Sequence, residues 1–323
     1  MDCVDIKVGF ACNNDCVHCV TADKRRFGEL TREQIQGEIE YWARQVVADD
    51  GDPSAVVLVL TGGEPTIRPE LPELIAYARG AGFERIELQT NARALSDAAL
   101  AEAVAEAGLT SALVALHAPI AEVHDAITQR PGGFAETTAG MRHLINHGVE
   151  VRVNAVISRL NLEHLPALVP FLAEQFPEVR LTQLTFPHPN GNAETNFERV
   201  VPPLAETAEV VVQTLRRGLR RGIWLLVEAI PVCLLPGFEK HSIDLRELEV
   251  GGTDVGSGAP EGRVADYRTA LQTEKRKGEQ CAECSVTSIC EGVWKEYADV
   301  FGTGELRPVS HLDPGYLMDV GMP

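Results

Sequence analysis

The sequence lacks any apolar run that approaches the ~20 residues needed to cross a bilayer. Its first residues, MDCVDIKVGF, also lack the basic start and the long apolar core of a secretory signal. The chain has 323 residues, 45% of them hydrophobic, which is enough material for a large buried core. We therefore expect a soluble, globular, cytoplasmic protein with no membrane partner.

Positive charge is also scarce. The chain carries 29 Lys and Arg against 47 Asp and Glu, which gives a formal net charge of -18. Sequence-independent binding to nucleic acid requires a basic surface, because contacts with phosphates dominate the affinity. We therefore expect no nucleic-acid partner.

Disulfides are not expected, because the cytosol keeps thiols reduced. The chain nevertheless has eight cysteines, and six of them fall into two clusters. One cluster lies between residues 12 and 19 and the other between residues 281 and 290. This clustering favours metal or redox chemistry.

The first cluster, Cys12, Cys16 and Cys19, has the spacing CxxxCxxC. Thiolates hold iron–sulfur clusters, ordinarily four of them, so a trio leaves one iron without a protein ligand. A structural zinc ion, with His18 as the fourth ligand, is the alternative. The tetrapeptide GGEP, residues 62–65, follows the next expected strand. Its glycines permit close approach of the backbone to a ligand, and its carboxylate is able to accept from an ammonium group.

Between residues 5 and 186, short apolar runs alternate with amphipathic stretches, a pattern typical of βα units around a parallel sheet. We expect strands at residues 5–10, 55–60, 85–89, 112–116, 149–157 and 180–185. Thr31 and Gln34 predict a capping box, followed by a helix whose apolar face is Ile35, Ile39, Trp42 and Val46. A further strand at 223–230 is expected to leave the barrel, and the glycine-rich stretch 251–262 is expected to be a flexible loop.

CxxxCxxC followed by GGEP resembles the radical S-adenosylmethionine (radical SAM) superfamily. The resemblance implies an α/β fold, a partial (β/α)6 TIM barrel at residues 1–222, with a [4Fe–4S] cluster on the three cysteines and SAM on its open iron. It also implies that the reduced cluster cleaves SAM to a 5′-deoxyadenosyl radical, which abstracts hydrogen from the substrate. The residues that it places around SAM are Gly62, Gly63, Glu64, Pro65, Asn91, Arg130 and Asn154.

The chain departs from this family at Ala115, because a serine is often found at that place on the fourth strand. His117 and His124 follow the same strand, where a histidine suits substrate contact or proton transfer, although His124 is expected on a helix surface. Glu228, Tyr297 and Asp299 are further candidates for the active site.

The second cluster, Cys281, Cys284 and Cys290, indicates a second metal centre. It resembles the SPASM and twitch extensions of radical SAM enzymes, which implies that residues 223–323 form a smaller, twitch-like extension with one auxiliary [4Fe–4S] cluster. Cys233 is the expected fourth ligand. Otherwise it is a catalytic hydrogen-atom donor, the role of a lone cysteine in radical SAM peptide epimerases. Zinc on these four thiolates is the remaining alternative.

The expected activity is therefore that of a radical SAM enzyme, an oxidoreductase or maturase that cross-links or epimerises a ribosomal peptide. Radical oxidation or rearrangement of a small natural-product or cofactor precursor is an alternative. A non-catalytic zinc-binding protein is the alternative of another class. The resemblance also implies a reductant of the flavodoxin or ferredoxin type as a partner.

Overall fold

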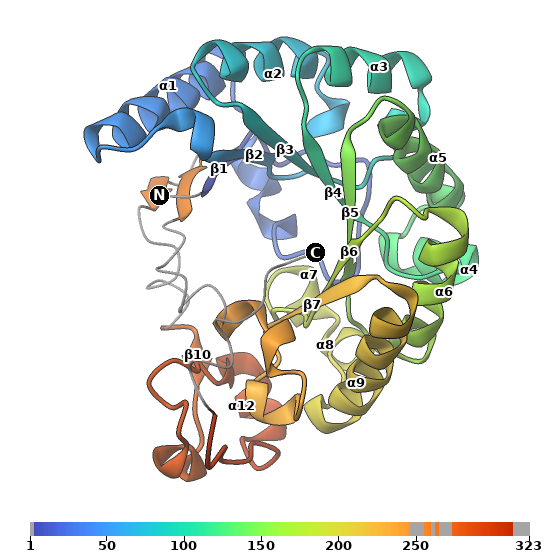
Figure 1. The fold of residues 1–323 in the computed structure, drawn as a ribbon, viewed down its shortest axis with the longest axis vertical. Helices are drawn as coiled ribbons and strands as arrows, with labels where there is room; N and C mark the ends of the chain where they lie inside the picture. The colour runs from blue at the N-terminus through green and yellow to red at the C-terminus, as the bar shows by residue number, and fades with distance from the viewer. Residues whose placement is uncertain (1–2, 246–254, 260–261, 265–272, 313–323) are drawn as a thin grey trace.

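A curved, parallel sheet with helices on its outer side forms the larger part of the chain in the computed structural model (Figure 1). The structure describes residues 3–245, 255–259, 262–264 and 273–312. Strands β1 to β7 follow one another across the sheet and pair in parallel. They span Cys3–Lys7, Val57–Thr61, Arg85–Thr90, Ser111–Ala115, Glu150–Val156, Leu181–Thr185 and Trp224–Glu228. The fold is the partial α/β barrel that the sequence predicts.

Helices connect the parallel strands, as such a sheet requires. The main helices are α1 Arg32–Ala48, α2 Leu71–Gly80, α3 Ala98–Glu106, α4 Ala121–Thr128, α5 Gly133–Asn146, α6 Leu165–Gln175 and α9 Leu204–Arg221. The short helices α7 Asn192–Thr195 and α8 Phe197–Val200 lie between β6 and α9. The capping box at Thr31 and Gln34 is present, and the four apolar residues predicted for α1 are its buried ones. The local pattern therefore predicted this helix correctly.

The strands place apolar and polar side chains on opposite faces of the sheet, because successive residues of a strand alternate. In β5, Val151 and Val153 are buried, whereas Asn154 is half-buried. The apolar set belongs to one large core with the helices. The polar set faces the barrel interior, where Asn154 lies beside Thr185 and Thr185 lies beside Glu228. The interior of the barrel is therefore polar near the carboxyl ends of its strands.

Two expectations about strands are wrong. Strand β7 does not leave the barrel but pairs in parallel with β6 along its whole length. Strand β8, Val255–Ala259, lies within the expected glycine-rich loop and pairs in parallel with β1. Strand β9, Gly262–Val264, pairs with β8 in antiparallel orientation. Pairing satisfies backbone hydrogen-bonding groups and does not depend on apolar side chains. Residues 251–254 and 260–261 of that stretch lie outside the described residues.

The part of the C-terminal extension that follows β7 contacts α8 and the start of α9 (Figure 1). It contains a small hairpin, β10 Lys275–Arg276 with β11 Val293–Trp294, followed by α12 Lys295–Phe301. Tyr297 of α12 is buried, packs against Phe186 with ring centroids 5.7 Å apart, and its hydroxyl accepts from the backbone N of Leu204 at 2.8 Å. This contact joins the extension to the barrel, while the boundary after residue 222 stays a prediction. No helix among the described residues is long and apolar enough to span a membrane.

Candidate functional site

The loop that carries Cys12, Cys16 and Cys19 follows β1 at the carboxyl edge of the sheet, where βα folds place their reactive groups. Distant parts of the chain hold its backbone. The hydrogen bonds are Asp15 N to Thr128 O at 3.1 Å, Val17 N to Ile127 O at 2.9 Å and Asn192 Nδ2 to Cys16 O at 2.9 Å. The three cysteines are therefore presented by a loop that α4 and α7 hold in place.

The donor set of this loop fits an iron–sulfur cluster. Burial raises the pKa of Cys12 to about 11, and burial together with the neighbouring Cys19 and Cys12 thiols raises the pKa of Cys16 above its usual range. Metal binding at these thiols must therefore release protons. Among the described residues, the ligand atoms that all lie within 4.8 Å of one another belong to Cys16, His18 and His117, not to the three cysteines. A single zinc ion lies about 2.3 Å from each sulfur that binds it. The sulfurs of Cys12, Cys16 and Cys19 would therefore have to lie closer together to bind one zinc ion.

The two glycines of GGEP allow the backbone of the turn after β2 to lie in contact with the backbone of the cysteine loop. Gly62 has a φ of 128°, and a Cβ there would lie 2.2 Å from the carbonyl oxygen of Gly9. A Cβ on Gly63 would lie 2.0 Å from the carbonyl oxygen of Ala11. The backbone N of Gly63 donates to Gly9 O and that of Glu64 to Ala11 O, both at 2.8 Å. Side chains at both glycines are therefore excluded by the protein itself, and a role of these residues in lining the SAM site stays a prediction.

Glu64 holds the ends of β2 and β3 together. The residue is 3% exposed, and its carboxylate accepts from Thr66 N at 3.0 Å, Thr66 Oγ1 at 2.6 Å, Thr90 Oγ1 at 2.6 Å and Asn91 N at 2.7 Å. Burial raises the pKa of Glu64, and these hydrogen bonds oppose the rise. Oε2 has one of the four donors, which leaves it acceptor capacity for a ligand. Pro65, also buried, begins the short 3-10 helix Pro65–Ile67 that supplies the Thr66 donors.

Asn91 and Arg93 connect β3 to the cysteine loop. The Asn91 side chain donates to Asn13 Oδ1 at 2.7 Å and lies 3.9 Å from the Cys12 sulfur. Arg93 donates to the Asn13 carbonyl at 2.6 Å and pairs with Glu136 at 2.6 Å. Sequence reasoning missed Arg93, although it follows the Thr-Asn pair in QTNAR and is a cation next to the expected site. Asn91 therefore contacts the cysteine loop, and its role in binding SAM stays a prediction.

Arg130 lies in the turn between α4 and α5 and is exposed. Its backbone N donates to Asp125 O at 3.2 Å, but within the described residues no hydrogen bond or ion pair is found for its guanidinium. The structure therefore brings Arg93, not Arg130, into contact with the cysteine loop, and the pairing of Arg130 with SAM stays a prediction.

Asn154 and Glu228 belong to one polar strip inside the barrel. Asn154 Oδ1 and Glu228 Oε2 each lie 2.9 Å from Thr185 Oγ1, and Gln183 donates to Glu228 Oε2 at 2.6 Å. Three neighbouring strands, β5 to β7, thus orient these side chains. The two other acidic or phenolic candidates lie elsewhere: Tyr297 is buried in the core, and Asp299 is exposed and pairs with Arg276 at 2.7 Å. Among these three candidates only Glu228 joins the interior strip.

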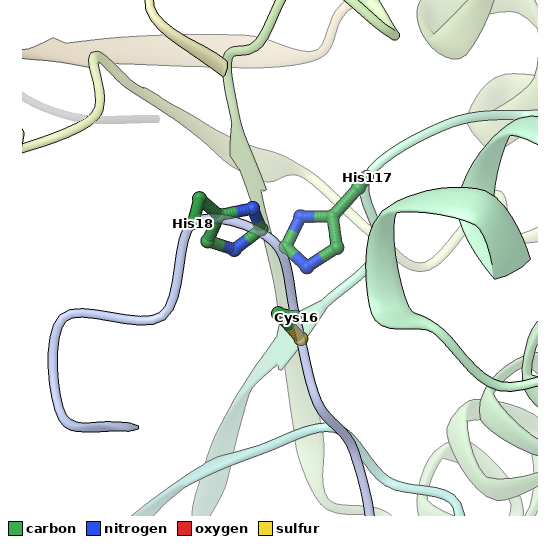
Figure 2. Close-up of side chains that lie close together, drawn as sticks. All are labelled: Cys16, His18 and His117. Atoms are coloured by element: carbon green, nitrogen blue, oxygen red, sulfur yellow. The ribbon is translucent and has the colours of Figure 1, made fainter. Parts of the chain in front are cut away.

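Two histidines, His18 and His117, lie beside Cys16 (Figure 2), and a third, His124, packs against His117. The rings of His18 and His117 meet edge-on, with centroids 4.7 Å apart, and those of His117 and His124 stack at 5.6 Å. Burial lowers the pKa of His18 and of His124 to about 4 and that of His117 well below its usual value. The expected surface position of His124 is wrong, because its side chain is 0% exposed. It packs inward from α4, onto His117.

The structure brings Cys233 to the second cysteine cluster. Burial, with the neighbouring thiols of Cys281 and Cys284, raises the pKa of Cys233. Burial, with Cys233 nearby, raises the pKa of Cys290 to about 11. Cys284 also accepts from the backbone N of Val309 at 3.3 Å. Four thiols therefore gather between the 3-10 helix Val232–Leu234 and the extension, a set that fits the ordinary ligation of an iron–sulfur cluster.

A buried charged group that sequence reasoning missed lies next to this cluster. Lys275 pairs with Glu291, and its ammonium lies 4.0 Å from Asp244 and 4.6 Å from the centroid of the Trp294 ring. The ring of His188 stacks on the same Trp294 ring, with centroids 3.8 Å apart. Burial raises the pKa of Asp244 to about 6. These residues come from segments far apart in the sequence, so no local spacing signals them. They join the extension to the end of β7, since Asp244 also accepts from the backbone N of Ala229 at 3.0 Å.

Known proteins resemble this chain in sequence. A family model described as the Radical SAM superfamily matches residues 6–172, more than half of the chain. An AdoMet-dependent heme synthase of Methanosarcina barkeri is 34% identical over 156 residues, 48% of this chain and 42% of that protein. The mycofactocin maturase MftC of Mycobacterium ulcerans is 27% identical over 220 residues, 68% of this chain and 56% of that protein. The chain spans about half the length of the curated relatives it matches.

Solved structures resemble it in fold. Streptococcus suis SuiB bound to the precursor peptide SuiA has a TM-score of 0.62 at 16% identity, covering 95% of this chain and 75% of that one. Native anSMEcpe with bound AdoMet has a TM-score of 0.65 at 15% identity, covering 96% of this chain and 93% of that one. Because coverage is nearly complete, the likeness includes the C-terminal extension. The family match, the barrel and the cysteine loop agree: the chain belongs to the radical SAM superfamily, enzymes that use a [4Fe–4S] cluster and S-adenosylmethionine.

Proposed function

We propose that Cys12, Cys16 and Cys19 hold the [4Fe–4S] cluster and that the chain uses it to modify a peptide. When bound, the cluster and SAM supply a 5′-deoxyadenosyl radical that abstracts hydrogen from the substrate. The observation that carries this proposal is the cysteine loop, held by α4, α7 and β3 at the carboxyl edge of the barrel. A firmly held loop keeps the sulfurs in place, as a functional site requires.

The residues around the loop have distinct tasks in this proposal. Glu64 fixes the β2 and β3 ends and offers Oε2 to the SAM ammonium group. Asn91 and Arg93 hold the loop from β3. Asn154 faces the interior from β5 and is placed to hydrogen-bond the bound cosubstrate. Arg130, with an exposed guanidinium, would have to turn inward to pair with the SAM carboxylate.

The second cysteine cluster supports an auxiliary [4Fe–4S] cluster on Cys233, Cys281, Cys284 and Cys290. Four thiolates leave no iron open, so this centre would serve electron transfer or structure. Cys233 lies near the other thiols, and this proximity favours its role as a cluster ligand over a role as hydrogen-atom donor. The zinc alternative for either cluster predicts a colourless protein without iron.

The peptide substrate is supported by the names of proteins that this chain resembles. MftC is named a maturase, SuiB was solved with its precursor peptide, and anSMEcpe was solved with a peptide named Cp18Cys. The alternative, a small-molecule substrate, is favoured by the heme synthase relative, which has the higher sequence identity of the two relatives compared above. The expected products are a cross-link or an inverted stereocentre in the peptide.

The test is co-expression with a short peptide encoded next to the gene, followed by mass spectrometry. A cross-link removes two hydrogens from the peptide, and epimerisation in deuterated water replaces one hydrogen of the peptide with deuterium. An unmodified peptide, combined with SAM-dependent turnover of a tetrapyrrole or another small precursor, would support the alternative. A flavodoxin or ferredoxin as electron donor is tested in the same assay, by replacing dithionite with each protein.

A further inference from the structure

His117 presents an unassigned hydrogen-bond donor to the cysteine loop. It follows β4, and one of its ring nitrogens, the Cys16 sulfur and a ring nitrogen of His18 all lie within 4.8 Å of one another. Figure 2 shows the His117 ring between the loop and the end of α4, with one ring nitrogen directed toward Cys16. His117 is 1% exposed, and within the described part of the chain that nitrogen has no hydrogen-bond partner.

The other contacts of His117 fix which nitrogen carries the proton. Its Nδ1 accepts from the backbone N of Val156 at 3.3 Å. A ring whose Nδ1 accepts is neutral and carries its hydrogen on Nε2. The backbone is held as well, because His117 N donates to His124 Nδ1 at 3.3 Å and Asn161 Nδ2 donates to His117 O at 2.7 Å. Nε2–H is therefore a fixed donor whose direction is set by β5 and α4.

His18 gives a second, independent indication that a group is bound here. His18 is 8% exposed, and its Nδ1 is buried without a hydrogen-bond partner within the described part of the chain. Buried polar atoms are normally paired, so an orphaned nitrogen beside Cys16 points to a partner that binds at the site.

We propose that His117 donates an Nε2–H hydrogen bond to the thiolate sulfur of Cys16 and thereby favours the reduced state of the cluster. The inference rests on the proposed function, since it requires a cluster on Cys16. Reduction adds negative charge to the cluster and its sulfurs, and a donor to sulfur stabilises that charge more in the reduced state than in the oxidised state. His117 is thus a positioning residue that acts through Cys16, in the way that hydrogen bonds around a metal site orient and tune its ligands.

The test is the reduction potential of the SAM-binding cluster in the reconstituted two-cluster protein. Electron paramagnetic resonance follows the titration, and the signal that changes on addition of SAM identifies the cluster. His117→Phe keeps a flat ring and removes the donor, whereas His117→Gln keeps an N–H. The matched control is His147→Phe, because His147 is exposed at the end of α5.

In His117→Phe we expect the ratio of reduced to oxidised cluster at a fixed potential to fall about tenfold, which is about 59 mV for a one-electron couple. Iron content should not change. His117→Gln should recover most of the loss, and His147→Phe should match the wild type. An unchanged potential in a fully loaded His117→Phe protein would overturn the inference. So would release of a single bound zinc ion, because His117 would then be a metal ligand.

A second measurement keeps the inference testable if His117→Phe does not load iron. In wild-type protein labelled with [15N]histidine, the reduced SAM-binding cluster should show weak hyperfine coupling to one histidine nitrogen. The coupling should persist in His18→Phe. Absence of coupling, or a coupling strong enough for direct ligation to iron, would overturn the inference. A wild-type protein without iron on the three cysteines would instead contradict the proposed function itself.

Discussion

Replacing Glu64 with glutamine tests how the end of β2 is held. The carboxylate accepts four hydrogen bonds, from Thr66, Thr90 and Asn91. In Glu64→Gln an amide NH2 group replaces one carboxylate oxygen. If it takes the place of Oε2, which accepts from the backbone N of Asn91 at 2.7 Å in the wild type, two donors face each other and that hydrogen bond is lost. A hydrogen bond to a charged group contributes about 1.5–3 kcal/mol, and each unsatisfied buried donor costs about 1–3 kcal/mol.

One effect opposes this loss. Burial of the charge raises the pKa of Glu64, so the neutral amide removes part of the cost of burying it. Weighing both, we expect Glu64→Gln to destabilise the protein by about 2–4 kcal/mol. Thr90→Val removes a single donor to the same carboxylate, and we expect a loss of about 1–2 kcal/mol.

The measurement is urea unfolding of the anaerobically reconstituted proteins, with iron content determined on the same samples. Glu64→Gln should unfold at lower urea than Thr90→Val, and Thr90→Val at lower urea than the wild type. Glu64→Gln should also retain less iron, because a shift of the β2 end would displace the backbone N of residue 64, which donates to Ala11 O of the cysteine loop at 2.8 Å. Equal midpoints for Glu64→Gln and the wild type would refute this reasoning.

Three further predictions follow from particular contacts. Gly63→Ala should destabilise the protein by about 3 kcal/mol or more, because its Cβ would lie 2.0 Å from Ala11 O. Gly37→Ala, on the exposed side of α1, should stabilise the protein by about 0.5–1 kcal/mol, and equal urea unfolding midpoints for the two variants would contradict this reasoning. Cys233→Ala should reduce iron from about eight to about four per chain, with Cys3→Ala as the unchanged control; unchanged iron and uncoupled 5′-deoxyadenosine formation would instead favour the hydrogen-donor role. Burial raises the pKa of Asp5, against the opposing effects of Lys7 and Cys3, so the folded state binds this proton more tightly than the unfolded chain and the contribution of Asp5 to stability should rise as the pH falls toward 4. Asp5→Asn should lose that part of the pH dependence, and parallel unfolding curves of the two proteins against pH would contradict the assignment.

Local patterns were sufficient for the first six strands of the barrel but not for the place of β7. The predicted strands overlap β1 to β6, and the capping box and buried face of α1 are found as predicted, because alternation and helical spacing reflect burial directly. Strand β8 was not predictable in the same way, since it is glycine-rich and pairs with β1 through its backbone. His124 was misplaced because a histidine in an amphipathic helix is usually exposed, whereas here it stacks on His117.

The candidate site also has a part that the sequence predicts and a part that only the structure shows. The cysteine loop and GGEP are contiguous motifs, so their joint location at the edge of the barrel followed from the βα order alone. The ion pairs of Lys275, by contrast, join segments far apart in the chain, which no local spacing encodes, and the contacts that Arg93 and His117 make with the cysteine loop are likewise visible only in the structure. The proximity of Cys233 to the extension cysteines was an expectation from ligand count, and the structure brings them together.

The central claim is that Cys12, Cys16 and Cys19 hold the cluster that cleaves SAM. The most direct measurement is iron content and 5′-deoxyadenosine formation in the anaerobically reconstituted wild type and in Cys16→Ala. The account predicts about eight irons per chain and SAM cleavage in the wild type, and about four irons without cleavage in the variant. Two zinc ions without iron, or SAM cleavage that persists in Cys16→Ala, would contradict it.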